Sequence, residues 1–186
     1  MALPQQRMTL EEFLAWEDQQ PERHEFYNGE VFAMVGGRRI HECVISNLAY
    51  RLRSHLEGSA CQVFVAGMKL QLAEDTVLYP DVLVTCDRDD LRADLAMRSP
   101  KLVIEVLSPS TQAYDRSQKF ALYRRLASLK EYLLIDPETQ RVEGFRRESD
   151  DRWLLVDMSQ DEVMDCASLG CAVPLAQVFE GINPAE

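Results

Sequence analysis

Two short apolar segments, each containing one acidic residue, constrain the fold of this chain more than any other feature. The first segment, VLYPDVLVTC, carries Asp81 directly after Pro80, and the second, KLVIEVLS, carries Glu105 between Ile104 and Val106. Apolar runs of this length are typical of buried strands. A buried carboxylate is costly unless it is paired or binds a metal ion. The two acidic residues therefore call for a shared explanation.

The order of the segments around these residues predicts a mixed β-sheet. Strand-like segments 77–86 and 101–108 follow each other closely, so we expect them to lie side by side and to place Asp81 and Glu105 on neighbouring strands. A helix from about residue 112 then leads to the segment EYLLI, which we expect to pair parallel with the Glu105 strand through a right-handed crossover. The predicted fold class is α/β, with α+β character, and helices on both sides of the sheet.

The N-terminal part of the chain predicts a helix, a hairpin and a second helix. Thr9 is a suitable N-cap for the first helix, and Pro21 is expected to end it. Asn28-Gly29 is a strong hairpin signal between strand-like residues. The segment 40–56 then has apolar residues at four-residue spacing, which indicates an amphipathic helix ended by Gly58.

The remaining pattern adds short strands, one more helix and a terminal hairpin. CQVFVA, MKLQLA and VLYPDVLVTC each read as a short strand, and TQAYDRSQKFALYRRLAS reads as one amphipathic helix. A hairpin is expected around residues 149–151, and a short helix from Pro174. The chain has no repeat and no linker-like segment, so we expect residues 1–186 to form a single domain.

Composition limits the class of protein. The 186 residues are 46% hydrophobic and 27% charged, which is typical of a globular protein. We find no apolar run long enough for a membrane span, and no secretion signal at the N-terminus, so we expect no membrane partner and a cytoplasmic location. The net charge of −11 argues against a large nonspecific nucleic-acid surface. It leaves open a local basic groove, or a partner that arrives with metal ions.

The cysteine pattern indicates neither a zinc site nor a disulfide framework. The chain has five cysteines, an odd number, and no CxxC pair. We expect buried reduced thiols, with a Cys166–Cys171 bridge as the alternative.

Two carboxylates on adjacent strands repel each other unless a cation lies between them. Magnesium suits such a pair, because it takes oxygen ligands, retains several waters and often needs only one or two carboxylates besides substrate phosphate. The carbonyl of Val106 could complete the ligand set. Lys119, on the following helix, could orient an attacking water and offset developing negative charge. Asp115, Lys119 and Tyr123 are spaced i, i+4, i+8 and should share one helix face.

The motifs YPDVLV, IEVLSPST and DRSQKFALY, with EFYNGEV and a histidine upstream, resemble the Uma-type restriction-endonuclease family of the PD-(D/E)XK nuclease superfamily. The resemblance covers residues 9–180. It implies a restriction-endonuclease-like fold and magnesium- or manganese-dependent hydrolysis of DNA phosphodiesters. By this resemblance Asp81 and Glu105 bind the metal, and Glu25 is a further acidic site residue. The superfamily's lysine belongs two residues after the second acid, where this chain has Leu107, and it maps instead to Lys119.

Structural interpretations stand beside these functional ones. Asp81 and Glu105 could cap a bend and pair with an arginine, Lys119 could pair with Asp115 in solvent, and Glu25 could be an exposed cross-strand acid. Three further residues are candidates for accessory roles, and each also suits a structural one; they are His41, Asp115 and Tyr123. The acidic segment CDRDDLRAD lacks the glycine and glutamate of a calcium loop, so we interpret it as a solvated turn.

Two classes of function follow. The first is a metal-dependent endonuclease that acts on DNA as a homodimer, since two-fold symmetry matches a duplex. The second is a nuclease-fold binding or accessory protein without activity, which the net charge and Leu107 favour. A third, weaker interpretation is a metal-dependent hydrolase acting on another phosphate ester.

Overall fold

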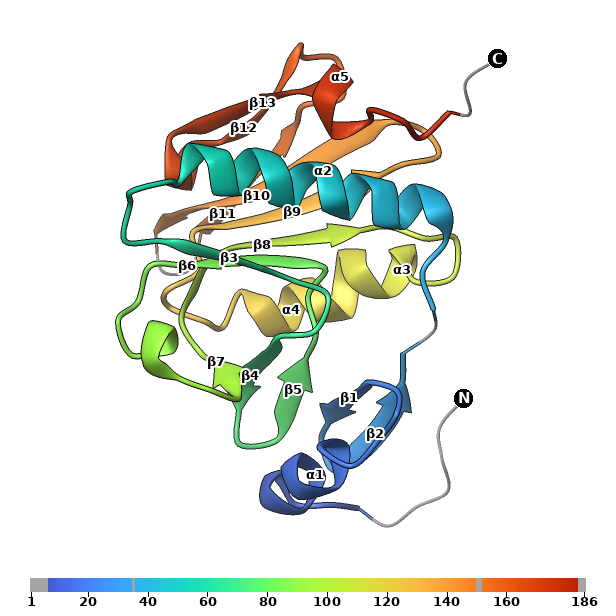
Figure 1. Ribbon diagram of the computed structural model, residues 1–186, viewed down its shortest axis with the longest axis vertical. Coiled ribbons are helices and arrows are strands. Elements are labelled where there is room, and N and C mark those ends of the chain that lie inside the picture. The colour runs from blue at the N-terminus through green and yellow to red at the C-terminus, as the bar shows by residue number, and fades with distance from the viewer. Residues whose placement is uncertain (1–6, 35, 150–151, 184–186) are drawn as a thin grey trace.

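The computed structural model describes residues 7–34, 36–149 and 152–183 (Figure 1). The helices are α1 (Leu10–Glu17), α2 (Arg39–His55), α3 (Gln112–Tyr114), α4 (Phe120–Tyr123) and α5 (Leu175–Val178), with 3-10 turns η1 (Asp90–Arg92) and η3 (Ala167–Leu169) and a π-helical turn η2 (Asp115–Lys119). The strands are β1 (His24–Tyr27), β2 (Glu30–Ala33), β3 (Gln62–Val65), β4 (Lys69–Ala73), β5 (Thr76–Leu78), β6 (Val82–Thr85), β7 (Ala96–Met97), β8 (Pro100–Val106), β9 (Glu131–Asp136), β10 (Arg141–Ser149), β11 (Arg152–Asp157), β12 (Val163–Cys166) and β13 (Cys171–Pro174).

A six-stranded mixed sheet forms the centre of the molecule, in the order β11-β10-β9-β8-β6-β3. Only β8 and β9 pair in parallel within it. Helix α2 lies along one face of the sheet, and the α3–α4 stretch lies on the other (Figure 1). The apolar side chains of the two faces form separate clusters, one beneath α2, α5 and the β12–β13 hairpin and the other beneath α4. The predicted mixed sheet with helices on both sides is confirmed.

The strand register explains how Asp81 and Glu105 come together. Strands β6 and β8 are antiparallel, with Val82 opposite Ile104. The next pair outward is therefore Asp81 and Glu105, at the end of β6. Glu105 itself pairs with Leu134 on β9 in the parallel direction, so both predicted strand neighbours of the Glu105 strand are confirmed.

The segment VLYPDVLVTC is not one strand, as the sequence pattern predicted, but two. Strand β5 belongs to a five-stranded sheet of order β2-β1-β5-β4-β7, whereas β6 belongs to the central sheet. The chain crosses between them at Tyr79, Pro80 and Asp81. Proline has no backbone N–H to donate, so it ends strand pairing at this point. Asp81 is thereby placed at the junction of the two sheets.

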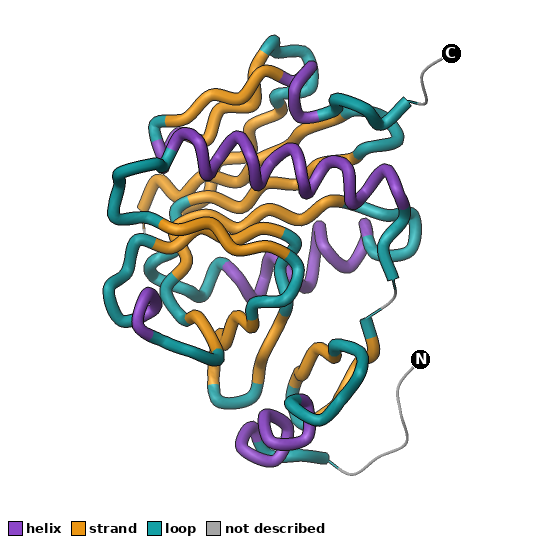
Figure 2. The backbone as a smooth tube through the Cα atoms, in the orientation of Figure 1, coloured by secondary structure: helices purple, strands orange, loops and turns teal. Residues whose placement is uncertain are grey.

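The N-terminal helix and hairpin form as expected. Thr9 and Glu12 make a reciprocal capping box at the start of α1, which ends at Glu17, before Pro21. Asn28 and Gly29 have φ angles of 55° and 85°, the left-handed conformations that a tight hairpin turn requires. In Figure 2 this helix and hairpin lie below the central sheet, and the hairpin supplies two strands of the smaller sheet.

Three further expectations can be compared with the structure. The helix predicted from about residue 112 is interrupted by the π-helical turn η2. Strands β10 and β11 pair as expected, while the turn at 150–151 lies outside the described residues. Helix α5 follows Pro174 as predicted. No helix in the described part of the chain is long and apolar enough to cross a membrane.

Cys61 and Cys86 form a disulfide between the ends of β3 and β6, so the prediction of free thiols is wrong for this pair. The strand register places the two residues opposite each other, with Cα atoms 4.0 Å apart. Cys166 and Cys171 also face each other, across β12 and β13, but both are free. The alternative Cys166–Cys171 bridge is therefore not formed.

The acidic segment after β6 is not simply solvated, because Asp90 is buried. Its carboxylate accepts hydrogen bonds from the Thr85 hydroxyl and from the backbone N–H groups of Arg98 and Ser99, at 2.8 to 3.0 Å. Asp90 thus fastens the loop to the start of β8. A carboxylate with three donors is satisfied in the interior.

Candidate active site

The residues predicted from the sequence converge where the start of β6 lies beside the end of β8. Five of them line a cleft of about 730 Å³, namely Glu25, His41, Asp81, Asp115 and Lys119. The remaining two, Glu105 and Tyr123, lie buried behind this cleft and contact its residues. Residues far apart in sequence are thereby brought together from β1, α2, the β5–β6 junction, β8 and the helical stretch after it.

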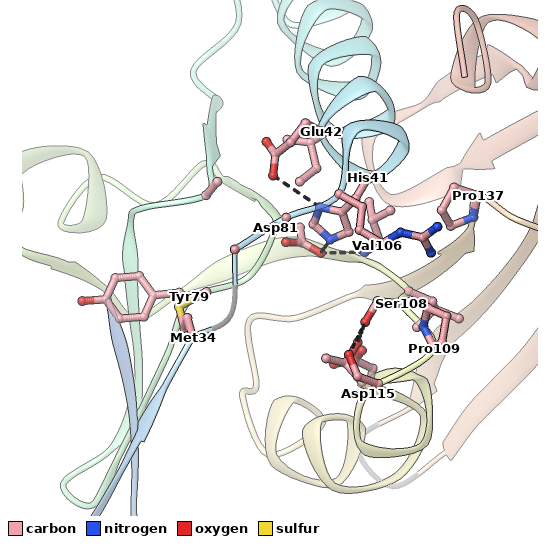
Figure 3. A pocket seen from close by; sticks show the side chains of 18 of the residues that line it. Met34, His41, Glu42, Tyr79, Asp81, Val106, Ser108, Pro109, Asp115 and Pro137 are labelled. Carbon is pink, nitrogen blue, oxygen red and sulfur yellow. Dashed lines mark hydrogen bonds and ion pairs between the residues drawn. The ribbon is translucent and has the colours of Figure 1, made fainter. Parts of the chain in front are cut away.

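Asp81 occupies the mouth of the site and is held by two neighbours. Its Oδ2 accepts a hydrogen bond from the backbone N–H of Val106 at 2.7 Å and lies 3.3 Å from Nε2 of His41. Figure 3 shows the imidazole of His41 pointing from α2 toward this carboxylate, with Glu42 on its other side. The backbone N–H of Val106 therefore binds the Asp81 carboxylate and holds it in this orientation.

Glu105 is buried on β8 beneath Asp81. Its Oε1 accepts hydrogen bonds from Nζ of Lys119 at 3.1 Å and from the hydroxyl of Tyr123 at 2.7 Å, and its Oε2 lies 3.4 Å from the backbone N of Asp81. Burial raises the pKa of Glu105 to about 8; Lys119 opposes the rise, while the charges of Asp81 and Asp115 add to it. A carboxyl group with this pKa is mostly protonated at neutral pH.

Lys119 lies between three carboxylates and is itself buried. Its Nζ is 3.1 Å from Glu105 Oε1, 3.2 Å from Glu25 Oε1 and 3.4 Å from Asp115 Oδ1. Burial alone would lower the pKa of Lys119, but the three carboxylates outweigh it and hold the pKa well above its usual value. Lys119 therefore stays charged, and the solvent-exposed lysine of the structural interpretation is wrong.

Burial and neighbouring charges also shift the pKa values of His41 and Asp115. Burial lowers the pKa of His41, but the hydrogen bond and charge of Asp81, together with Glu42, raise it above its usual value. Burial raises the pKa of Asp115, and Lys119 opposes this rise. Clusters of perturbed groups in a cleft are a physical indication of a functional site.

The charges of the cluster do not balance. The carboxyl groups of Glu25, Glu105 and Asp115 surround the single ammonium group of Lys119, and a fourth carboxyl group, that of Asp81, lies beside His41 instead. Glu25 Oε1, Asp115 Oδ1 and His41 Nδ1 are also buried without a hydrogen bond of good geometry. Both oxygens have Lys119 as an ion-pair partner, and a divalent cation would relieve the remaining repulsion among the carboxyl groups.

The oxygen donors suit magnesium or manganese rather than a softer metal. Among the described residues, no group of three or more His, Cys, Asp and Glu is arranged to hold an ion by itself. A site that takes its ligands from Asp81 and Glu105 would thus leave the remaining positions to water and substrate oxygens. This is the usual ligand set of a catalytic magnesium ion.

A further buried carboxylate, outside the cleft, supports the site, and the sequence did not reveal it. Glu17 of α1 is fully buried, and its Oε1 accepts hydrogen bonds from the backbone N–H of His24 and from the hydroxyl of Tyr79, both at 2.9 Å. Its Oε2 lies 3.0 Å from Nδ1 of His24. His24 precedes Glu25, and Tyr79 stands two residues before Asp81. Glu17 therefore links the segment that carries Glu25 to the segment that carries Asp81.

Comparison with known proteins identifies the family of the chain. Residues 10–176 match the model of the Uma2 family, which is described as "Putative restriction endonuclease". The chain belongs to the Uma2 family. It is 33% identical over 180 residues to "Uncharacterized protein slr1290" of Synechocystis sp., covering 96% of this chain and 95% of that protein. A second Synechocystis protein, "Uncharacterized protein sll1609", is 35% identical over 154 residues, covering 81% of this chain and 87% of that protein.

A solved structure shares the fold of this Uma2-family chain. The crystal structure of a "putative nuclease" from Anabaena variabilis superposes with a TM-score of 0.76 at 18% identity, covering 95% of this chain and 99% of that one. The likeness agrees with the mixed α/β fold class expected from the sequence. Leu107, where the resemblance given above leads us to expect a lysine, is buried with the apolar residues beneath α4. The amino group next to Glu105 comes instead from Lys119.

Proposed function

We propose that this protein is a metal-dependent endonuclease that hydrolyses DNA phosphodiester bonds. The observation that carries the proposal is the pairing of Asp81 with Glu105 across β6 and β8, with the Lys119 ammonium 3.1 Å from Glu105. Two carboxyl groups that could hold a metal ion and one ammonium group therefore lie at the cleft or directly behind it. Family membership supports the same class of reaction.

The roles of the residues follow from their chemistry. Asp81 and Glu105 would hold a magnesium or manganese ion, which when bound supplies an activated water and stabilises the leaving oxygen. Lys119 would orient the attacking water and offset the negative charge of the transition state. Glu25 and Asp115 hold Lys119 in place through ion pairs. His41 and Tyr123 orient Asp81 and Glu105, respectively.

The charge of the cleft bears on how DNA would bind. Acidic residues outnumber lysine and arginine residues six to three along it; they are Glu22, Glu25, Glu42, Asp81, Asp115 and Glu138, against Arg23, Arg38 and Lys119. A phosphate group would therefore be repelled unless a cation enters with it. We accordingly expect DNA binding at this cleft to depend on divalent metal as well as on ionic strength.

We further propose that the protein acts as a homodimer. Strand β11 is an edge of the central sheet, and Leu154 and Leu155 on it are 49% and 58% exposed. An edge strand with exposed apolar residues offers free backbone groups and apolar surface to a second chain. Light scattering at micromolar concentration would test this, and a 21.3 kDa monomer would refute it.

The decisive experiment is a cleavage assay with matched variants. Purified protein is incubated with plasmid, branched and single-stranded DNA, with magnesium, manganese or chelator. The parent should cleave at least one substrate only with metal, and Asp81→Asn and Glu105→Gln should not. Asp90→Asn is the control, because it alters another carboxylate outside the cleft. Cleavage by Asp81→Asn at the parent's rate would refute the proposed site.

The alternative is a nuclease-fold protein that binds DNA or a partner without cleaving. It is favoured by Leu107, which removes the lysine from its usual strand position, and by the acidic net charge. Metal-dependent DNA binding by the parent without cleavage of any substrate would support this alternative. Four carboxyl groups clustered in this way lower the stability of the fold, and their presence favours the enzyme over the binding protein.

A further inference from the structure

The segment that carries Lys119 contains a π-helical turn. The turn η2, Asp115–Lys119, is continuous with α3 before it and α4 after it. Such turns are rare, occur mostly as single inserted turns within α-helices, and are frequent at functional sites. Here the first and last residues of the turn, Asp115 and Lys119, both line the cleft.

The geometry of the turn explains why three side chains reach one point. In an α-helix each step of four residues overshoots a full turn by about 40°, so residues i and i+8 differ in direction by about 80°. A wider turn, closed by i→i+5 bonds, advances less per residue and offsets this drift. Accordingly, Lys119 Nζ and the Tyr123 hydroxyl lie 3.1 and 2.7 Å from the same oxygen of Glu105, while Asp115 Oδ1 lies 3.4 Å from Lys119 Nζ.

A buried tyrosine holds the turn in place. Tyr132 of β9 is fully buried, and its hydroxyl donates a hydrogen bond to the backbone carbonyl of Asp115 at 3.0 Å. Buried carbonyl groups require a partner, and a change of helical hydrogen bonding disturbs their regular pairing. The ring of Tyr132 also contacts those of Phe120 and Tyr123, with centroids 5.7 and 5.2 Å away. The helix on either side of Lys119 is thus fastened to the sheet.

We propose that the η2 turn, held by the hydroxyl of Tyr132, aims Lys119 at Glu105 and so supplies the amino group that Leu107 cannot. Tyr132 is a positioning residue, since it contacts the backbone of the turn and does not line the cleft. This proposal rests on the proposed function, because it explains how the fold positions the lysine that the reaction would use. Its geometry can be tested independently of any nuclease activity.

The test removes one residue from the turn. Ser117 is exposed within η2, and its deletion should convert the turn to regular α-helix and swing Lys119 away from Glu105. Ser117→Ala, which keeps the chain length, is the control. Each background is combined with Lys119→Met, and melting temperatures are measured at pH 8 with chelator. Lys119→Met should lower the melting temperature of the parent and of Ser117→Ala but should not lower that of the deletion variant further. An equal loss in all three backgrounds would overturn the proposal.

A second variant decides the matter if the deletion variant does not fold. Tyr132→Phe removes only the hydroxyl, and Tyr27→Phe, in the same apolar cluster, is its control. In Tyr132→Phe the melting-temperature loss caused by Lys119→Met should be smaller than in the parent. In the cleavage assay kcat should fall while manganese affinity stays that of the parent. If Tyr132→Phe changes neither quantity, the hydroxyl does not position Lys119. A parent without cleavage activity would refute the proposed function, while the melting-temperature comparison would still decide this inference.

Discussion

Replacing Glu105 by glutamine should stabilise the metal-free protein at alkaline pH. Burial and the neighbouring acids raise the pKa of Glu105 from 4.5 to about 8, with Lys119 opposing the rise. The folded state therefore binds this proton more tightly than the unfolded state. The contribution to stability is fully present below pH 4.5 and is lost as the pH rises through about 8. Glutamine does not ionise, so the variant should not show this loss.

The size of the effect follows from the shift in pKa. At about 1.36 kcal/mol per unit, the difference between 4.5 and 8 corresponds to about 5 kcal/mol of unfolding free energy. Glutamine retains one oxygen for the donors Tyr123 and Lys119 but replaces the oxygen nearest the backbone N of Asp81. We therefore expect the variant to gain about 2–5 kcal/mol relative to the parent between pH 5 and pH 8.5.

The assay is urea unfolding of parent and variant at several pH values with chelator, then with magnesium. Magnesium should stabilise the parent by about 2.7 kcal/mol at a hundredfold excess over its dissociation constant, and the variant by less. Asp90→Asn is the control, since its carboxylate lies outside the cleft and accepts three hydrogen bonds. A stability difference between parent and Glu105→Gln that does not change with pH would refute the electrostatic argument.

Substitutions at three further positions probe the lysine, the supporting carboxylate and the disulfide. Lys119→Met should lower kcat by about 10²–10³-fold, as removal of a group that stabilises the transition state does. Its manganese affinity, measured by calorimetric titration, should equal that of the parent. Loss of manganese binding would instead indicate a structural role for Lys119. Glu17→Leu should lower both the stability and the cleavage activity, because the Tyr79 hydroxyl and the His24 backbone N–H each lose their acceptor, at a cost of about 1–3 kcal/mol of unfolding free energy per donor. Glu17→Gln keeps an acceptor oxygen and should restore cleavage. Unfolding curves and activity measurements check both variants. Cys61→Ser should cost about 3 kcal/mol of unfolding free energy through loss of the cross-link over 25 residues; an unchanged midpoint between oxidised parent and variant would contradict the stabilising role of the bridge.

The sequence pattern by itself indicated most of the residues that meet at the site, and the family resemblance supplied Glu25 and His41. Asp81 and Glu105 stand out because a carboxylate in an apolar strand is rare, and successive strands tend to be neighbours in space. The spacing of Asp115, Lys119 and Tyr123 already indicated one helix face. The hairpin turn at Asn28-Gly29 follows from local conformational preference alone. Each of these signals is carried by residues close together in the chain.

Tertiary structure decided the features that depend on residues far apart in the chain. Glu17 looks like any solvated helix acid in the sequence, and only the docking of α1 against Tyr79 and His24 makes it a buried acceptor. Likewise, the bridge between Cys61 and Cys86 depends on the register of two strands.

The same holds for the local irregularities at the site. The split between β5 and β6 depends on which sheet each half joins, because residues on both sides of Pro80 have strand-forming character. The π-helical turn is stabilised by the Tyr132 hydroxyl from β9 and by the burial of Lys119 among three carboxylates. Local sequence preference favours a plain α-helix there, and long-range packing outweighs it.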